Sequence, residues 1–308
     1  MSKSLLRSLL PFISLAVVLG ATFYVQPRTM SYFGLNLMLQ YAVPIALATI
    51  AQMFVITVND LDLSIGPFVG LVGCVSATLL YANPILGTLV LLLFIAAYAA
   101  VGALIQSRNL PSIVVTLGLS FVWLGIAVLI LPSPGGKAPD WLKGIMALKI
   151  PLIPFPIIAA IVIGLAVQAA LMHSSYGVIA RGAGGNPRAL QRAGWSMLKT
   201  KSAMFALAGF FGVLSGLSLL GLTTSADAHV ADRYTLYTIA GVILGGGEFI
   251  GGRVSPLGAV VGALTLALAG SFLIFLKISP DWQIGAQGAI LIIVLALKAP
   301  LTVGEQRG

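Results

Sequence analysis

Apolar runs of roughly twenty residues recur along nearly all of this 308-residue chain, and they limit its possible folds more than any other feature. An α-helix needs about 20 apolar residues to cross the hydrocarbon core of a bilayer. Only 8% of the residues are charged, whereas a typical soluble domain has roughly 25%. Backbone polar groups in lipid must be satisfied within the spanning element itself, which favours helices. The sequence therefore predicts an all-α, polytopic membrane protein with a single transmembrane domain over residues 1–308.

Polar residues, prolines and glycines divide the apolar runs into about ten expected transmembrane helices. The expected ranges are 6–25, 32–57, 64–82, 85–106, 111–131, 153–172, 202–222, 235–247, 255–276 and 283–298. The first run is too long for the hydrophobic region of a signal peptide, so we expect it to be retained. The second range is interrupted by Gln40, Pro44 and Gln52, and the eighth is short. Either could therefore form a broken or re-entrant element.

The placement of lysine and arginine predicts the orientation of the chain. With the N-terminus in the cytoplasm, eleven of the 17 cations fall on the cytoplasmic side. Five of them, with no acid, lie in the segment 173–201, and moving these across the membrane would cost on the order of 15 kcal/mol. We therefore expect 173–201 to be cytoplasmic and the loop 132–152 to be external. The net charge of +9 fits this topology better than it fits a nucleic-acid-binding surface.

The reactive side chains argue against an enzyme. Cys74 is the sole cysteine, and His173 and His229 are the only histidines, far apart in the sequence. No metal-binding or nucleophile–base pattern is present. Lys137 follows a glycine, but the remainder of a phosphate-binding loop is missing. We therefore expect no catalytic residue, metal or cofactor.

The stretch 180–194 predicts a short helix outside the membrane. Asn186 can cap its start, Pro187 suits the first helical position, and Gly194 suits the stop. Such a helix has about seven residues and is roughly 10 Å long, too short to span lipid.

Two faces of this short helix differ in chemistry. Arg188 and Arg192 lie four residues apart on one face, and Ala189 and Ala193 form a second, flat face. Another protein could approach the alanine face. A solvated connector explains the same residues equally well.

A second stretch, 57–66, places several polar groups between two apolar helices. Asp62 or Ser64 can cap the following helix, and carboxylates favour a helix N-terminus. At membrane depth the same groups would instead belong to a transport pathway or gate. The candidate pathway or gate residues are Gln40, Gln52, Asn59, Asp60, Asp62 and Ser64.

A third stretch, 237–264, is rich in glycine. It predicts a tight reversal between two helices, with an ion pair between Glu248 and Arg253 across the turn. Glycines four positions apart on either side, as in 241/245 and 258/262, are typical of closely packed membrane helices. The turn residues are Gly246, Gly247, Gly251, Gly252 and Arg253.

Together these stretches resemble the signatures of the ribose/xylose/arabinose class of ABC sugar permeases. That class lies within the larger family that includes branched-chain amino acid permeases. The matching segments are 61–66, 185–194 and 246–258, in the same order and spacing, and the resemblance extends over about 35–298. Asn59 and Asp60 stand where the family often has glycines, and Thr235 stands where it often has an acid.

The resemblance implies a permease subunit that carries a sugar or sugar-like solute across the bacterial inner membrane by alternating access. Its implied partners are a second permease subunit, identical or different, a periplasmic sugar-binding protein and a cytoplasmic ABC ATPase that hydrolyses the ATP. The region 173–201 would contact the ATPase, and membrane lipid would surround the bundle. The alternative is a self-sufficient secondary transporter or channel, which should show paired ionisable groups inside the membrane.

Overall fold

The computed structural model describes residues 3–249 and 251–278, together with 282, 285, 288 and 289. Within this part the regular secondary structure is helical, and loops and turns connect the helices; there is also one isolated bridge between Gly135 and Ala226. The tenth expected helix, 283–298, lies largely outside the described residues. The all-α, polytopic membrane class predicted from the sequence is confirmed.

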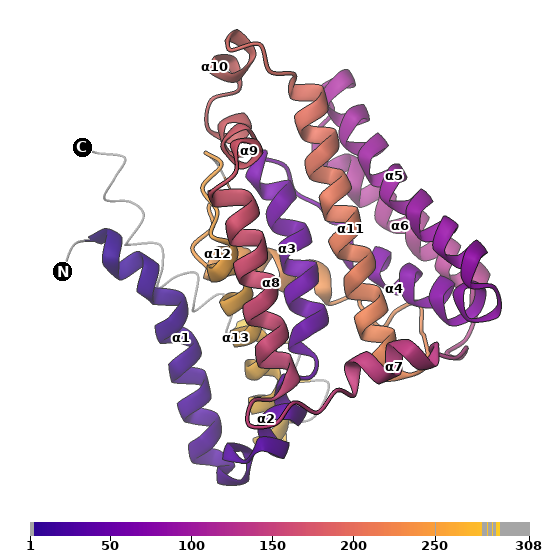
Figure 1. Cartoon of the computed structure of the whole chain (residues 1–308), viewed down its shortest axis with the longest axis vertical. Helices are drawn as coiled ribbons and strands as arrows, with labels where there is room; N and C mark the ends of the chain where they lie inside the picture. Colours follow the sequence, from indigo (N-terminus) through magenta and orange to yellow (C-terminus); the bar gives the residue numbers. More distant parts are fainter. Residues whose placement is uncertain (1–2, 250, 279–281, 283–284, 286–287, 290–308) are drawn as a thin grey trace.

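The described helices form an elongated bundle (Figure 1). A 3-10 turn at Pro27–Met30 follows α1, and a π-helical turn at Ser76–Leu80 continues α4. The helices are α1 (Lys3–Val25), α2 (Tyr32–Leu39), α3 (Ala42–Thr57), α4 (Ile65–Val75), α5 (Pro84–Arg108), α6 (Ser112–Ile130), α7 (Asp140–Met146), α8 (Phe155–Met172), α9 (Ser175–Gly185), α10 (Pro187–Arg192), α11 (Met197–Thr223), α12 (Tyr234–Leu244) and α13 (Pro256–Phe275).

Not every expected span is a long, continuous helix. Among the described residues, α5, α6, α8, α11 and α13 are long and apolar enough to cross a membrane, and α2 with α3 makes a sixth candidate. The count of ten spans is therefore not confirmed by length and composition. The expected interruption of the second range is confirmed, because α2 and α3 are bent by 40° at Gln40 and Tyr41.

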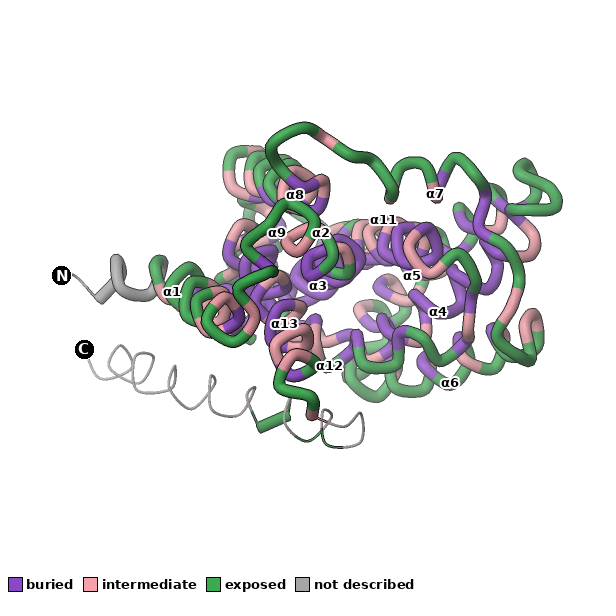
Figure 2. The backbone as a smooth tube through the Cα atoms, turned by 90° about the horizontal axis from the view of Figure 1, so that it is seen from below, coloured by how far each residue is buried: buried purple, intermediate pink, exposed green. Residues whose placement is uncertain are grey.

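The core of the bundle is α3, which is buried along its whole length. Figure 2 shows it as a largely buried helix between α8, α11, α12 and α13. A helix that is apolar on every face belongs inside a bundle, where no face meets water or lipid headgroups. By contrast, less than a third of α5, α6 and α8 is buried, and their exposed side chains are mostly apolar. These helices present a surface suited to lipid.

Glycines bring α12 and α13 into backbone contact. A Cβ atom added at Gly258 would collide with the carbonyl of Gly245, and one at Gly262 would collide with that of Gly241. Since lipid supplies no hydrophobic force between helices, such close packing contributes much of their association. The paired glycines thus allow the backbones of α12 and α13 to pack in direct contact.

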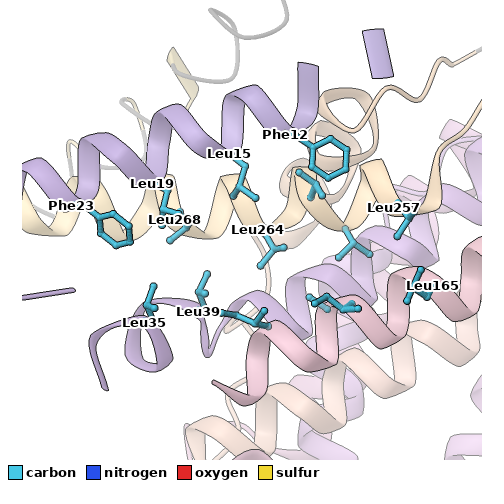
Figure 3. A pocket seen from close by; sticks show the side chains of 15 residues that line it. Phe12, Leu15, Leu19, Phe23, Leu35, Leu39, Leu165, Leu257, Leu264 and Leu268 are labelled. Atoms are coloured by element: carbon cyan, nitrogen blue, oxygen red, sulfur yellow. The ribbon is translucent and has the colours of Figure 1, made fainter. Parts of the chain in front are cut away.

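A groove of about 540 Å³ opens between α1, α2, α8 and α13 (Figure 3). The fifteen described side chains that line it are all apolar, among them Phe12, Leu19, Leu165 and Leu264. A solute with hydroxyl groups would lose its hydrogen bonds to water there and gain none. The groove therefore suits apolar chains, and the polar chemistry lies elsewhere.

Candidate functional site

The three sequence stretches meet at Asn59. Its Nδ2 donates a hydrogen bond to the carbonyl of Gly184 at 2.6 Å, and its Oδ1 accepts one from the backbone N–H of Gly251 at 3.1 Å. Asn59 follows α3, Gly184 lies near the end of α9, and Gly251 belongs to the glycine turn. The residue has a φ of +60°, a conformation that asparagine tolerates better than most side chains. One side chain thus joins segments 125 and 192 residues apart.

Glycine is required at this junction because backbones touch. A Cβ atom at Gly184 would collide with the carbonyl of Thr57 and lie 2.9 Å from the Cα of Gly252. A Cβ atom at Gly252 would collide with the carbonyl of Arg181. Gly252 also has a φ of +65°, which disfavours any larger residue. Glycines on both sides therefore allow the turn to pack closely against α9.

Asp60 forms a nearly buried ion pair with Lys201 of α11. The Nζ–Oδ2 distance is 2.8 Å, and the side chains are 8% and 14% exposed. Removing one partner of such a pair leaves an unpaired buried charge, which costs about 3 to 5 kcal/mol. The ion pair connects the loop after α3 to the beginning of α11, and nothing in the sequence indicates that these two residues meet.

Asp62 is fully buried and accepts several hydrogen bonds. Its Oδ1 accepts from the backbone N–H and the hydroxyl of Ser64, at 2.7 and 2.6 Å. Its Oδ2 accepts from the Tyr98 hydroxyl of α5 at 2.9 Å. When the Gln52 amide is oriented to satisfy its neighbours, its nitrogen donates to the Asp62 carbonyl at 2.9 Å. Its oxygen then accepts from the Asp62 backbone N–H at 3.2 Å. These bonds satisfy polar groups that would otherwise be costly to bury.

The expected cap of α4 by Asp62 or Ser64 differs in the structure. Ser64 occupies the N-cap position, but its side chain makes no capping hydrogen bond because its hydroxyl binds Asp62. The Oγ1 of Thr235, from α12, instead accepts from the backbone N–H of Gly66 at 3.1 Å. The start of α4 is thus capped from another helix.

Hydroxyl groups of α6 hold the rest of the irregular segment 58–64. Ser112 accepts from the backbone N–H of Leu61 at 3.2 Å, and Thr116 accepts from that of Leu63 at 3.0 Å. Non-helical backbone inside a membrane protein needs such partners. The roles of Ser112, Thr116 and Thr235 could not be predicted from the sequence, because isolated hydroxyls in apolar helices resemble ordinary helical residues.

The candidate pathway residues therefore fall into two places. Gln52, Asp62 and Ser64 have no exposed surface and bind groups of this same chain. Asn59 is exposed at the junction, and Gln40 lies apart from them at the bend between α2 and α3. In the described part of the chain, the segment 58–64 is a polar joint that hydrogen-bonds to the surrounding helices.

The glycine turn closes as the sequence predicts. Arg253 and Glu248 form an ion pair of 3.7 Å, and the backbone N–H of Glu248 donates to the Arg253 carbonyl at 2.9 Å. Gly246 and Gly251 adopt positive φ angles of +95° and +91°. The pair is partly exposed and contributes only about 0 to 1 kcal/mol. The turn conformation depends mainly on its glycines.

The short helix α10 begins and ends where the sequence predicts. The Oδ1 of Asn186 accepts from the backbone N–H of Ala189 at 3.0 Å, Pro187 is the first helical residue, and Gly194 has a φ of +84°. The preceding helix, α9, was not expected, because its four glycines in eleven residues disfavour helix. Its packing against the glycine turn stabilises it.

Helix α10 lies at the far end of the bundle, and none of its residues is buried. Arg188, Ala189, Arg192 and Ala193 are all exposed. Figure 1 places α7, from the loop 132–152, at the opposite end. The two segments predicted to face opposite sides of the membrane therefore lie at opposite ends of the molecule.

Comparisons of the sequence with known proteins identify its family. Residues 34–295 match the family described as branched-chain amino acid transport system / permease component. The ribose import permease protein RbsC of Haemophilus influenzae is 26% identical over 96% of this chain and 94% of its own length. The galactose/methyl galactoside import permease protein MglC of Escherichia coli K12 is 27% identical, covering 94% and 93%.

A third relative, the probable ABC transporter permease protein YphD of Escherichia coli K12, is 27% identical over 86% of this chain and 81% of its own length. No solved structure gives a significant match. The family match covers most of the chain, including all three of the sequence stretches that meet at Asn59. The chain therefore belongs to the branched-chain amino acid transport system permease family, and it is a membrane permease subunit of an ATP-binding-cassette importer rather than an enzyme.

Proposed function

We propose that this permease carries a sugar or sugar-like solute across the bacterial inner membrane by alternating access. Similarity to permeases named for ribose and galactose import supports the solute class. The working unit would contain a second permease subunit, a periplasmic sugar-binding protein and a cytoplasmic ABC ATPase. The N-terminus and the segment 173–201 would face the cytoplasm, because five cations without an acid resist translocation.

The proposed topology keeps ten spans. The described part supplies nine of them when α2 with α3 counts as one broken span, and when the short helices α4 and α12 each belong to one. The apolar range 283–298 would be the tenth. Short or interrupted spans at the centre of a transporter are common, because neighbouring helices satisfy their freed backbone groups.

The proposed mechanism rests on the two helices that flank α10. Asn59 and Asp60, which are adjacent in sequence, each contact one of these helices. Asn59 binds the carbonyl of Gly184 in α9, which precedes α10. Asp60 binds Lys201 in α11, which follows α10. A movement of α10 driven by an ATPase would therefore reach the segment 58–64 from both sides. We propose Asn186, Pro187, Arg188, Ala189, Arg192, Ala193 and Gly194 as the coupling element.

The same segment continues into the middle of the bundle. Asp62 and Ser64 bind Tyr98 of α5, and Gly66 binds Thr235 of α12. In this proposal, the polar joint acts as a gate that passes the movement of α10 to α4, α5 and α12. Packed interfaces with two discrete arrangements are the usual way in which small shifts become pathway opening.

The test of this function uses glutamate on the alanine face of α10. Ala189→Glu and Ala193→Glu introduce bulk and charge into the proposed contact, while both positions remain exposed in the isolated subunit. We expect loss of ATPase co-purification and of transport-coupled ATP hydrolysis, with normal membrane expression.

Lys137→Glu, at the opposite end of the molecule, is the control and should behave as wild type. If both α10 variants retain ATPase binding and full uptake, α10 is not the coupling element. Uptake of D-ribose and D-galactose by the reconstituted wild-type complex tests the solute class separately.

A further inference from the structure

The residues between α11 and α12 run back into the protein beside α4. Ala226 packs on Gly73, the Ala228 carbonyl lies 2.5 Å from a Cβ added at Gly70, and the Ala231 carbonyl lies 2.6 Å from one added at Gly66. Gly66 and Gly73 are seven positions apart, which corresponds to about 10 Å along a helix. The segment 226–231 therefore runs along α4, from the level of Gly73 to the level of Gly66, before α12 begins.

Aromatic contacts establish the depth that it reaches. Phe68 lies between Gly66 and Gly70, and its ring centroid is 4.5 Å from Tyr98 and 5.7 Å from Trp123. Tyr98 and Trp123 lie near the middle of α5 and α6, two of the long apolar helices. Residues 228–232 are thus level with the middle of the membrane-spanning bundle.

This middle level carries exposed polar and charged side chains. His229 Nδ1 and Asp232 Oδ2 are 2.9 Å apart, and the two side chains are 59% and 48% exposed. Arg233 is also exposed, and Asp227 Oδ1 accepts a hydrogen bond from the backbone N–H of His229 at 2.9 Å. His229 lies in the turn between α11 and α12. The depth of this turn could not be predicted from the sequence, because the count of cations gives the order of the segments and not their depth.

Lipid is an unsuitable neighbour for this surface. At the same level, the exposed residues of α5 and α6 are apolar, such as Leu93 and Val122, adjacent in sequence to Phe94 and Trp123. Ionisable side chains at the bilayer centre are expensive unless they meet water or a partner. Figure 2 shows α12 at the margin of the bundle, where it packs on α13, α3 and α4. An aqueous pathway would remove the desolvation penalty.

We infer that His229, Asp232 and Arg233 form a solute-binding site on the wall of the transport pathway. A carboxylate, an imidazole and a guanidinium together accept and donate hydrogen bonds, as an uncharged polyhydroxylated solute requires. Discontinuous elements at the bilayer midplane are where transporters commonly hold their substrates. The solute class rests on the proposed function, whereas the aqueous exposure of the site does not.

The first experiment measures aqueous exposure without any knowledge of the solute. His229→Cys is prepared in the chain with Cys74→Ala, which removes the single native cysteine. The reconstituted complex is treated with a charged, membrane-impermeant methanethiosulfonate, with and without ATP. We expect His229→Cys to react in at least one state, and Leu93→Cys, at the same level, to stay unlabelled. Protection of His229→Cys in every state would overturn the inference.

The second experiment measures solute recognition. Asp232→Asn removes the charge with little change of shape, and Asp140→Asn makes the same change at an exposed position in α7. With D-ribose and D-galactose as probes, we expect Asp232→Asn to raise KM at least about tenfold, because a hydrogen bond to a charged group is lost. Asp140→Asn should leave KM unchanged. An unaltered KM for Asp232→Asn with a transported probe would overturn the inference. If the wild type transports neither probe, the proposed solute class fails, and the labelling experiment alone decides the site.

Discussion

Asp60 and Lys201 form an ion pair of 2.8 Å that joins the loop after α3 to the start of α11. Next to it in sequence, Asn59 binds the carbonyl of Gly184 in α9. The two helices that flank α10 are therefore held by two consecutive residues of one loop. Through these side-chain contacts, a movement of either helix would act on the irregular segment. This relationship makes coupling between the two ends of the permease testable residue by residue.

The ion pair itself gives the first prediction. Asp60→Asn and Lys201→Met should each lower the free energy of unfolding by about 3 to 5 kcal/mol, since each leaves one buried group without its partner. The double variant should be more stable than the sum of the single losses predicts. Thermal unfolding of the detergent-purified subunit, analysed as a double-mutant cycle, measures this coupling. Additive losses would mean that the two charges do not interact in solution.

Uptake separates a gate from a purely structural pair. We expect Asp60→Asn to reduce uptake more strongly than it reduces membrane expression, because the variant disconnects α11 from the segment 58–64. Asp140→Asn, in an exposed pair with Lys143, provides the matched control. Wild-type uptake by Asp60→Asn would assign the pair to stability alone.

Two substitutions at Asn59 distinguish backbone conformation from hydrogen bonding. Asn59→Gly accepts the φ of +60° but removes the bonds to Gly184 and Gly251. Asn59→Ala removes the same bonds and adds backbone strain of about 1 kcal/mol or more. We expect both to uncouple ATP hydrolysis from uptake, and only the alanine variant to lose additional stability. Normal coupling in Asn59→Gly would show that the junction does not transmit movement.

Close packing of α12 on α13 predicts opposite effects for two glycine substitutions. Gly258→Ala should destabilise the fold, because its methyl group would meet the carbonyl of Gly245. Gly125→Ala in α6, with no atom near the added methyl group, should be neutral or stabilise by up to about 1 kcal/mol. Melting temperatures of the two purified variants provide the comparison. Equal melting temperatures would refute the contact between the two glycines.

The proposed orientation predicts one-sided labelling. Ser175 and Ser133 are exposed at opposite ends of the bundle, and the chain has a single native cysteine, Cys74, which is buried. In intact cells, an impermeant maleimide should label Ser133→Cys and leave Ser175→Cys unmodified until the membrane is permeabilised. Labelling of both from outside would refute the topology.

The extent of prediction from sequence differs between elements for physical reasons. The long spans and α10 were predicted because their signals are local: an apolar run, an N-cap and a terminal glycine. Helices α7 and α9 were not predicted. Helix α7 is short, and α9 is rich in glycine, which disfavours helix, so tertiary packing rather than local sequence stabilises them. Similarly, the expected cap by Ser64 fails because its hydroxyl binds the buried carboxylate of Asp62.

The sequence by itself determined the membrane class, the approximate spans, the likeness to transport permeases and the two ends of the short helix α10. Each depends on local composition or on motifs that a linear chain displays. Only the tertiary structure decided that Asn59 joins three distant segments, that Asp60 meets Lys201, and that His229 and Asp232 lie at the middle of the bundle. Partners and depth arise from folding, because a side chain in an irregular segment can reach many places until the surrounding helices pack.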